Sequence, residues 1–234
     1  MRAYYKTHVG LVREQNEDTV LVDEREGIYI LADGMGGHKA GEVASLLAAT
    51  TLRDALAGQT PSASALHSGF RKANEAVYEK QLTDSALSGM GTTMTALWNC
   101  GDYVLLGHVG DSRAYLFMNG RLRQISEDHS MVGEMVRSGV LTEDEAFTHP
   151  YRNVITRAVG TDASVRADVV QILKTPGSRW LLCSDGLTDL VRDPEIAQAL
   201  RDAPGEAAAD RLVEMALANG GRDNVSVLLV EVDA

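Results

Sequence analysis

Three short apolar segments, each ending at an aspartate next to a glycine, constrain this chain most. The segments are residues 28–33, 103–111 and 180–185, and they end at Asp33, Asp111 and Asp185. Each apolar run is too short for a typical helix and predicts a buried strand. Three buried strands that each carry an aspartate to a sheet edge exceed what turn formation requires.

The loop after Asp33 is the most constrained in the chain. It contains Gly34, Gly36 and Gly37, so its backbone can approach a ligand closely. The Gly34 carbonyl is therefore a candidate ligand. His38, at the end of this loop, is a better functional candidate than the other five histidines, which we expect at the surface or in packing roles.

Hairpin geometry brings further aspartates to the same place. Residues 19–23 and 28–33 flank a four-residue polar loop, and this spacing predicts a hairpin with Val22 near Tyr29 and Asp18 opposite Asp33. The same reasoning places Gly91 beside the Gly110-Asp111 pair.

A fifth aspartate comes from the end of the chain. Asp223 precedes a strand at 225–230 that we expect to run antiparallel to the strand before Asp185, so both reach one edge. Five converging carboxylates would repel one another unless cations bind them. Oxygen ligands without cysteines or a histidine pair favour Mg²⁺ or Mn²⁺ over zinc.

Two such metals about 3.5–4 Å apart suit phosphoester hydrolysis, because they activate a water and hold phosphoryl oxygens. The position of Asp33 in the constrained loop makes it our candidate for the bridge between the two ions. Arg13 is the candidate phosphate clamp, since a planar guanidinium can bind two phosphate oxygens at once. Each motif alone is typical of an ordinary turn, loop or surface residue, so the prediction depends on their combination.

The order of elements predicts the fold class. Strands are followed by two helices (42–56 and 62–82), strands, a polar excursion at 128–160, strands, two helices (194–203 and 205–218) and a last strand. Hairpins dominate, and no regular alternation of strand and helix appears. We therefore expect an α+β chain with antiparallel sheets and outer helices, organised as a single domain over 1–234, whose 128–160 excursion is a candidate mobile flap.

Composition limits the partners. The formal charge is 22 − 33 = −11, which argues against nucleic acid and membrane surfaces because both favour basic patches. The first residues lack the apolar core of a signal peptide, and no apolar run approaches the ~20 residues of a membrane helix. We expect Cys100 and Cys183 to be buried thiols of a cytoplasmic protein rather than a disulfide.

Six motifs in order resemble one known family. They are Arg13-x-x-Asn16-Glu17-Asp18, Ala32-Asp33-Gly34-Met35-Gly36-Gly37-His38, Gly91-Thr92-Thr93, Gly110-Asp111-Ser112-Arg113, Ser184-Asp185-Gly186-Leu187 and Asp223-Asn224-Val225-Ser226. Together they resemble the metal-dependent serine/threonine phosphatases of the protein phosphatase 2C (PP2C, or PPM) family, bacterial branch. The resemblance spans residues 10–230 and implies a four-layer α-β-β-α sandwich of two stacked antiparallel sheets.

The resemblance also implies roles for individual residues. Asp33 would bridge two Mn²⁺ or Mg²⁺ ions, Gly34 would contribute its carbonyl, and Asp185 and Asp223 would complete the second site. Asp111 would bind a third, weaker metal. Asp18 would act nearby through water, and the 128–160 excursion would match the flap of the family.

One position departs from the eukaryotic pattern. Eukaryotic members carry a histidine directly after the Asp-Gly pair, where it is thought to protonate the leaving alcohol, whereas this chain has Met35, as bacterial members do. The general acid is then either a metal-bound water or His38. The sequence ends at Ala234, soon after the last strand and without the linker and membrane helix of some bacterial relatives, which implies a cytoplasmic form.

The function implied is hydrolysis of phosphoserine and phosphothreonine in proteins by a water that a dinuclear metal centre activates. The expected partners are a cognate serine/threonine kinase and its targets, and we expect a monomer. No Cys-x₅-Arg loop is present for a cysteine nucleophile. Two alternatives stay open, namely a phosphatase dedicated to one regulatory phosphoprotein and a non-catalytic member that binds phosphoproteins.

Overall fold

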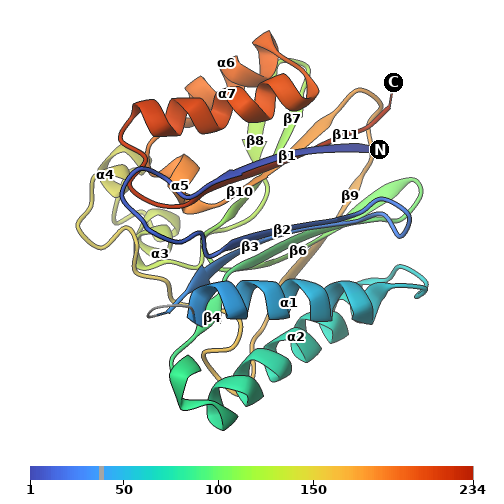
Figure 1. Cartoon of the computed structure of the whole chain (residues 1–234). Helices are drawn as coiled ribbons and strands as arrows, with labels where there is room; N and C mark the ends of the chain where they lie inside the picture. Colours follow the sequence, from blue (N-terminus) through green and yellow to red (C-terminus); the bar gives the residue numbers. More distant parts are fainter. Residues whose placement is uncertain (37–39, 234) are drawn as a thin grey trace.

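Two stacked antiparallel sheets form the centre of the molecule (Figure 1). The computed structural model describes residues 1–36 and 40–233. One sheet has the strand order β1 (Arg2–His8), β11 (Val225–Glu231), β10 (Arg179–Cys183), β7 (Arg113–Met118), β8 (Arg121–Gln124). The other has the order β2 (Asp18–Asp23), β3 (Ile28–Met35), β5 (Met94–Asn99), β6 (Tyr103–Val109), β9 (Asp168–Leu173), with the short β4 (Gly91–Thr92) paired to β3.

Two helix pairs cover the outer faces of the sheets. Helices α1 (Ala40–Leu56) and α2 (Ala63–Thr83) pack on the sheet that contains β3, and α6 (Asp193–Asp202) and α7 (Gly205–Ala218) pack on the sheet that contains β10 (Figure 1). The short helices are η1 (Ser85–Leu87), α3 (Met131–Arg137), α4 (Glu143–Phe147) and α5 (Asp185–Thr188). The predicted α+β, four-layer α-β-β-α sandwich is confirmed.

Strand alternation produces three apolar layers. In β3, Ile28 and Ile30 pack toward α1 and α2, while Tyr29 and Leu31 pack between the two sheets. In β10, Trp180 and Leu182 face the other sheet, and Leu181 and Cys183 face α6 and α7. Both faces of these strands are buried, which explains why their sequences are continuous apolar runs.

The predicted hairpin between β2 and β3 is confirmed. Asp18 lies opposite Asp33 and Val22 lies opposite Tyr29. The placement of Gly91 beside Gly110-Asp111 was wrong, because Thr93 is the residue that lies against Gly110, whereas Gly91 pairs with Met35 at the end of β3. Strand β1 was not predicted; its largely exposed residues pair with β11 at the edge of the sheet.

The 128–160 excursion forms a small helical segment beside the sandwich. It contains α3 and α4, and an isolated bridge between Ser130 and Ile155 joins its two ends. A capping box at Thr142 begins α4. Cys100 and Cys183 are free thiols. None of the helices in residues 1–36 and 40–233 is long and apolar enough to span a bilayer.

Candidate metal centre

A cavity of about 570 Å³ opens where strands of the two sheets end together, and it is lined by three of the predicted carboxylates. Asp33 lies two residues before the end of β3, Asp185 follows β10, and Asp223 precedes β11. Strands β10 and β11 are antiparallel, so the end of one lies beside the start of the other. The cavity also contains Gly34 and Arg13. The structure thus brings together five of the residues predicted from the sequence.

Hydrogen bonds from the Gly91-Thr92-Thr93 motif fix Asp33. The backbone N–H of Asp33 donates to Thr93 Oγ1 at 3.0 Å, and its carbonyl accepts from Thr93 N at 2.9 Å and from Thr92 Oγ1 at 2.8 Å. With its backbone held from both sides, Asp33 presents its carboxylate to the cavity. These threonines therefore orient the predicted bridging ligand.

Gly34 lies where no side chain fits. A Cβ at this position would lie 2.1 Å from the carbonyl oxygen of Gly41 and 2.6 Å from that of Glu17. The Gly34 N–H donates to the same Glu17 carbonyl at 3.1 Å. The β3 end, the loop before β2 and the start of α1 are thus packed backbone to backbone, which explains the glycine at this position.

Asp18 and Asp33 form a half-buried acidic pair across β2 and β3. Asp18 Oδ2 accepts from Ser184 Oγ at 3.0 Å, whereas Asp18 Oδ1 is buried without a partner among the described residues. Burial, aided by repulsion from Asp223, raises the pKa of Asp18 to about 6. Burial and the charges of Asp18 and Asp185 raise the pKa of Asp33 well above its usual range. A bound cation would relieve both effects.

Asp185 links the first cavity to a second one. The second cavity, of about 640 Å³, lies between the 128–160 segment and the α5–α6 region, and Asp111 lines it together with Asp185. Asp111 is 7% exposed, and its Oδ1 also lacks a hydrogen-bond partner in the described part of the chain. Burial and the neighbouring Asp128 raise the pKa of Asp111 to about 7. Asp111 is thus separate from the Asp33 cavity but suited to another cation.

The donor set fits hard divalent ions, although the carboxylates surround a cavity rather than close on one point. Among residues 1–36 and 40–233, no group of three or more His, Cys, Asp or Glu side chains forms a ready-made metal cage. Mg²⁺ and related ions retain several water ligands, so carboxylates around a water-sized space are sufficient. Two buried, unpaired oxygens favour bound cations: that of Asp18, which lies opposite Asp33 but does not itself line its cavity, and that of Asp111 in the second cavity.

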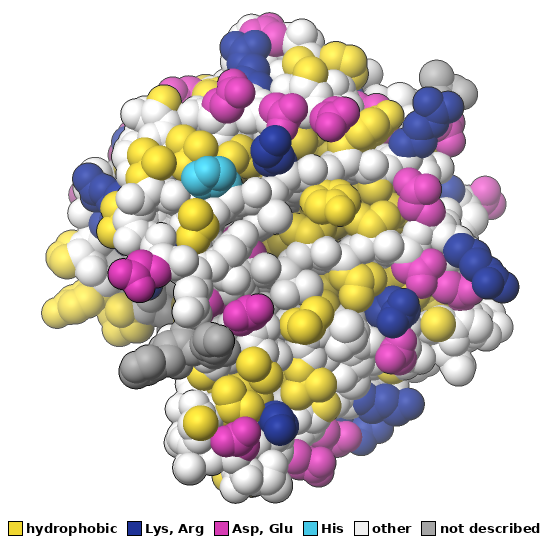
Figure 2. Space-filling view, viewed as in Figure 1, with side chains coloured by type: hydrophobic (Ala, Val, Ile, Leu, Met, Phe, Trp, Pro, Cys, Tyr) yellow, Lys and Arg dark blue, Asp and Glu magenta, His cyan; other side chains and the backbone are white. Residues whose placement is uncertain are grey.

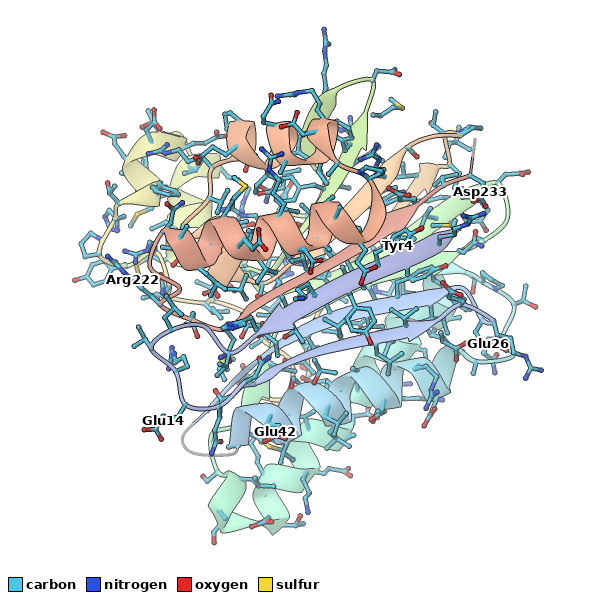
Figure 3. The ribbon with its side chains drawn as sticks, turned by 45° about the horizontal axis from the view of Figure 1, so that its top comes forward. Tyr4, Glu14, Glu26, Glu42, Arg222 and Asp233 are labelled. Atoms are coloured by element: carbon cyan, nitrogen blue, oxygen red, sulfur yellow. The ribbon has the colours of Figure 1, made fainter. Side chains whose placement is uncertain are left out.

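Arg13 is paired with Asp223, with Arg13 Nη2 2.8 Å from Asp223 Oδ2. The Arg13 side chain is 55% exposed, and the hydrogen bond to Asp223 raises the pKa of its guanidinium. The sequence neighbours Glu14 and Arg222 point outwards at the edge of the molecule (Figure 3). The predicted phosphate clamp and a predicted metal ligand are thus partners in this structure.

Asn224 holds the loop that carries Arg13. Asn224 Nδ2 donates to the carbonyls of Val9 and Gln15 at 2.9 and 2.8 Å, and Asn224 Oδ1 accepts from Glu17 N at 2.8 Å. The Asp223-Asn224 motif therefore supplies both a cavity carboxylate and the support for the opposite loop.

The histidines do not contribute to the described part of the Asp33 cavity. His38 lies outside the described residues. His108 and His129 are buried and hydrogen-bonded, and neither lines the Asp33 cavity. Residues 153–162, which include Arg157, form one wall of the cavity and were not predicted as site residues. These residues follow the helices of the 128–160 excursion, and no local motif marks them.

Comparisons with known proteins agree with this geometry. The family model "Protein phosphatase 2C" matches residues 8–220. The serine/threonine phosphatase stp of Listeria monocytogenes (strain F2365) is 38% identical over 243 residues, covering 100% of this chain and 96% of the relative. The crystal structure of the Mycobacterium tuberculosis serine/threonine phosphatase PstP/Ppp superposes with a TM-score of 0.93 at 39% identity, covering 100% of this chain and 99% of that one.

A further structure shows a relative with metal. The catalytic domain of the serine/threonine protein phosphatase PstP, in complex with two manganese ions, has a TM-score of 0.89 and 38% identity, covering 99% of this chain and 98% of that one. The family model spans nearly the whole fold, and the cavity carboxylates lie within or just beyond its range. This chain belongs to the protein phosphatase 2C family.

Proposed function

We propose that this protein is a Mn²⁺- or Mg²⁺-dependent phosphatase that hydrolyses phosphoserine and phosphothreonine in proteins. The half-buried carboxylates of Asp33 and Asp185, which line one cavity and have raised pKa values, carry the proposal, because such a cluster is stable when ionised only if cations bind it. Membership of the protein phosphatase 2C family and the manganese complex of a relative support the same activity.

Asp33, the Gly34 carbonyl, Asp185 and Asp223 would hold two ions, with Asp33 as the shared ligand, and Asp111 would hold a third, weaker one. When bound, such ions lower the pKa of a water and neutralise charge on a phosphoryl group. Ser184 and the β2–β3 pairing hold Asp18 beside Asp33, where it can orient that water through a hydrogen bond.

Arg13 would bind the substrate phosphate after leaving Asp223. A cation on Asp223 would weaken its attraction for the guanidinium, and the exposed Arg13 side chain is free to rotate toward the cavity it already lines. A phosphate would then replace the carboxylate as the partner of Arg13, and it can accept two parallel hydrogen bonds where Asp223 accepts one. The Arg13–Asp223 pair would therefore keep the clamp near the site in the absence of substrate.

The expected partners are phosphoproteins, and we extend the proposal to a cognate serine/threonine kinase and its targets. On the face shown in Figure 2, lysine and arginine side chains are dispersed among acidic ones rather than gathered in a basic patch. This surface, with the net charge of −11, suits protein substrates better than nucleic acid. We also propose a monomer, which sedimentation analysis would test.

The test is phosphate release from a phosphothreonine peptide. We expect release with Mn²⁺, none with excess chelator, and a loss of about a hundredfold or more in Asp185→Asn. Asp102→Asn is the matched control, because Asp102 is exposed in the turn between β5 and β6. Folded protein without activity in any divalent ion would refute the proposal and favour a non-catalytic, phosphoprotein-binding role.

A further inference from the structure

We propose that Arg157 is a second substrate-binding arginine, which binds an anionic group of the substrate from the cavity wall formed by residues 153–162. The inference rests on the proposed phosphatase function and adds a specific contact to it. Arg157 lines the same cavity as Asp33, Asp185 and Asp223.

One edge of the Arg157 guanidinium is anchored. Arg157 Nη1 donates to Asp168 Oδ1 at 3.1 Å and to the carbonyl of Arg166 at 3.1 Å. These two bonds use both hydrogens of Nη1. Nε and Nη2 have no hydrogen-bond partner within residues 1–36 and 40–233, and the side chain is 34% exposed. The guanidinium is thus fixed in place with donors left for a ligand.

The anchor is itself fixed by a buried histidine. His129 Nε2 lies 3.0 Å from Asp168 Oδ2, and His129 Nδ1 accepts from Gly110 N at 3.0 Å. Because Nδ1 accepts, the ring proton lies on Nε2 and is donated to Asp168. Arg157 Nη1 and His129 Nε2 lie 2.9 Å apart, but both are donors to the Asp168 carboxylate, so no hydrogen bond forms between them.

The charges around the cavity explain why Arg157 is available. The acidic residues that line it are Glu17, Asp33, Asp162, Asp185 and Asp223, and the basic ones are Arg13 and Arg157. Arg13 is bound to Asp223 within the cavity. The carboxylate partner of Arg157, Asp168, is not among the lining residues, so it holds the arginine from behind and leaves the cavity side open.

A guanidinium presented in this way binds oxyanions through two parallel hydrogen bonds. Two groups of a phosphoprotein carry suitable oxygens, namely the phosphoryl group and an acidic side chain beside the phosphorylated residue. A small phosphate ester separates these sources, because it contains only the first.

The experiment compares Arg157→Ala and Arg157→Lys with wild type and with Arg166→Ala in Mn²⁺. Arg166 is an exposed arginine nearby, and truncating its side chain leaves the carbonyl that accepts from Arg157. The substrates are para-nitrophenyl phosphate and phosphothreonine peptides with neutral or acidic flanking residues. We expect KM to rise about tenfold or more in Arg157→Ala, with kcat within about twofold of wild type.

The substrate dependence identifies the anion. A KM increase with para-nitrophenyl phosphate as well as peptides assigns the contact to the phosphoryl group, and an increase confined to acidic peptides assigns it to the flanking carboxylate. Unchanged KM for every substrate, relative to Arg166→Ala, overturns the inference while leaving the phosphatase function intact. An inactive wild type would instead refute the phosphatase function.

A binding measurement makes the test independent of turnover. A fluorescent peptide that carries both a non-hydrolysable phosphonate and acidic flanking residues should bind Arg157→Ala at least about tenfold more weakly than wild type. Asp168→Asn, which removes the charge behind Arg157, should give a smaller rise in KM with kcat preserved, as expected of a positioning residue. Equal affinity of wild type and Arg157→Ala for the phosphonate would contradict the inference.

Discussion

Asp18→Asn should stabilise the metal-free protein at neutral pH. Asp18 lies opposite Asp33, and its Oδ1 is buried without a hydrogen-bond partner in the described part of the chain. An asparagine has nearly the same shape, retains an oxygen that can accept from Ser184 and adds an N–H₂ group that can donate to Asp33. It cannot ionise, so the repulsion within this pair disappears.

The magnitude follows from the pKa of Asp18, which burial raises from 3.8 to about 6. A difference of about two units corresponds to about 3 kcal/mol of unfolding free energy. Because the pKa is higher in the folded state, this stability is fully present below pH 3.8 and is lost as pH rises through about 6. The titration is shared with Asp33, so the loss belongs to the pair.

The titration of His108 changes the free energy of unfolding with pH in the opposite direction, so its contribution must be removed from the comparison. Burial lowers the pKa of His108 to about 4, so its contribution is present above its unfolded pKa of 6.5 and is lost as pH falls toward 4. The difference between variant and wild type cancels this effect. Urea unfolding in EDTA, followed by the fluorescence of buried Trp98 and Trp180, measures both proteins at pH 4 and pH 7.5.

We expect the stability of Asp18→Asn relative to wild type to increase by about 3 kcal/mol from pH 4 to pH 7.5. With saturating Mn²⁺ at pH 7.5, wild type should gain more stability than the variant, because bound cations offset the repulsion between the Asp18 and Asp33 carboxylates, which the variant lacks. A difference that is the same at both pH values would refute the description of Asp18 as a buried, destabilised carboxylate.

Three further predictions concern the same region. Gly34→Ala should lower the free energy of unfolding by roughly 1–3 kcal/mol in thermal or urea denaturation, because its Cβ would lie 2.1 Å from the Gly41 carbonyl oxygen, and an unchanged midpoint would contradict this packing. Arg13→Lys should raise KM for a phosphothreonine peptide by about tenfold, since lysine cannot form the two parallel bonds of a guanidinium, whereas equal KM values would show that Arg13 remains on Asp223. Exchange of residues 128–160 for the segment of a relative should change the preference among phosphopeptides, and an unchanged preference would remove this segment from substrate selection.

Much of the fold was predictable because both faces of the central strands are buried. The hairpin expected from residues 19–23 and 28–33 forms as β2 and β3, since apolar runs and a four-residue polar loop define it. By contrast, strands β4 and β5 are separated at Thr93. There the backbone bonds to Asp33 across the site, a long-range interaction that the local pattern does not contain.

The convergence of carboxylates was predictable for a similar reason. Hairpin register and strand direction place Asp18 opposite Asp33 and bring Asp185 and Asp223 to one cavity. The pairing of Arg13 with Asp223 was not predictable, because it joins residues 210 positions apart through a loop without a local signal.

The cavity wall around Arg157 also depends on tertiary structure. This wall is set by how the chain returns from the 128–160 segment toward β9, with Asp168 and His129 as anchors. His129, taken as a surface or packing residue from the sequence, is a buried hydrogen-bonding residue.

Anomalous diffraction from crystals of the wild-type protein soaked in Mn²⁺ would test the metal centre most directly. We expect two strong peaks in the cavity that contains Asp33, Asp185 and Asp223, each about 2.0–2.3 Å from carboxylate oxygens, with Asp33 in contact with both ions. The Asp33→Asn protein, soaked in the same way, should lose at least one of them. Manganese peaks that avoid this cavity, or none in wild-type crystals, would contradict a metal-dependent phosphatase site at this edge of the sheets.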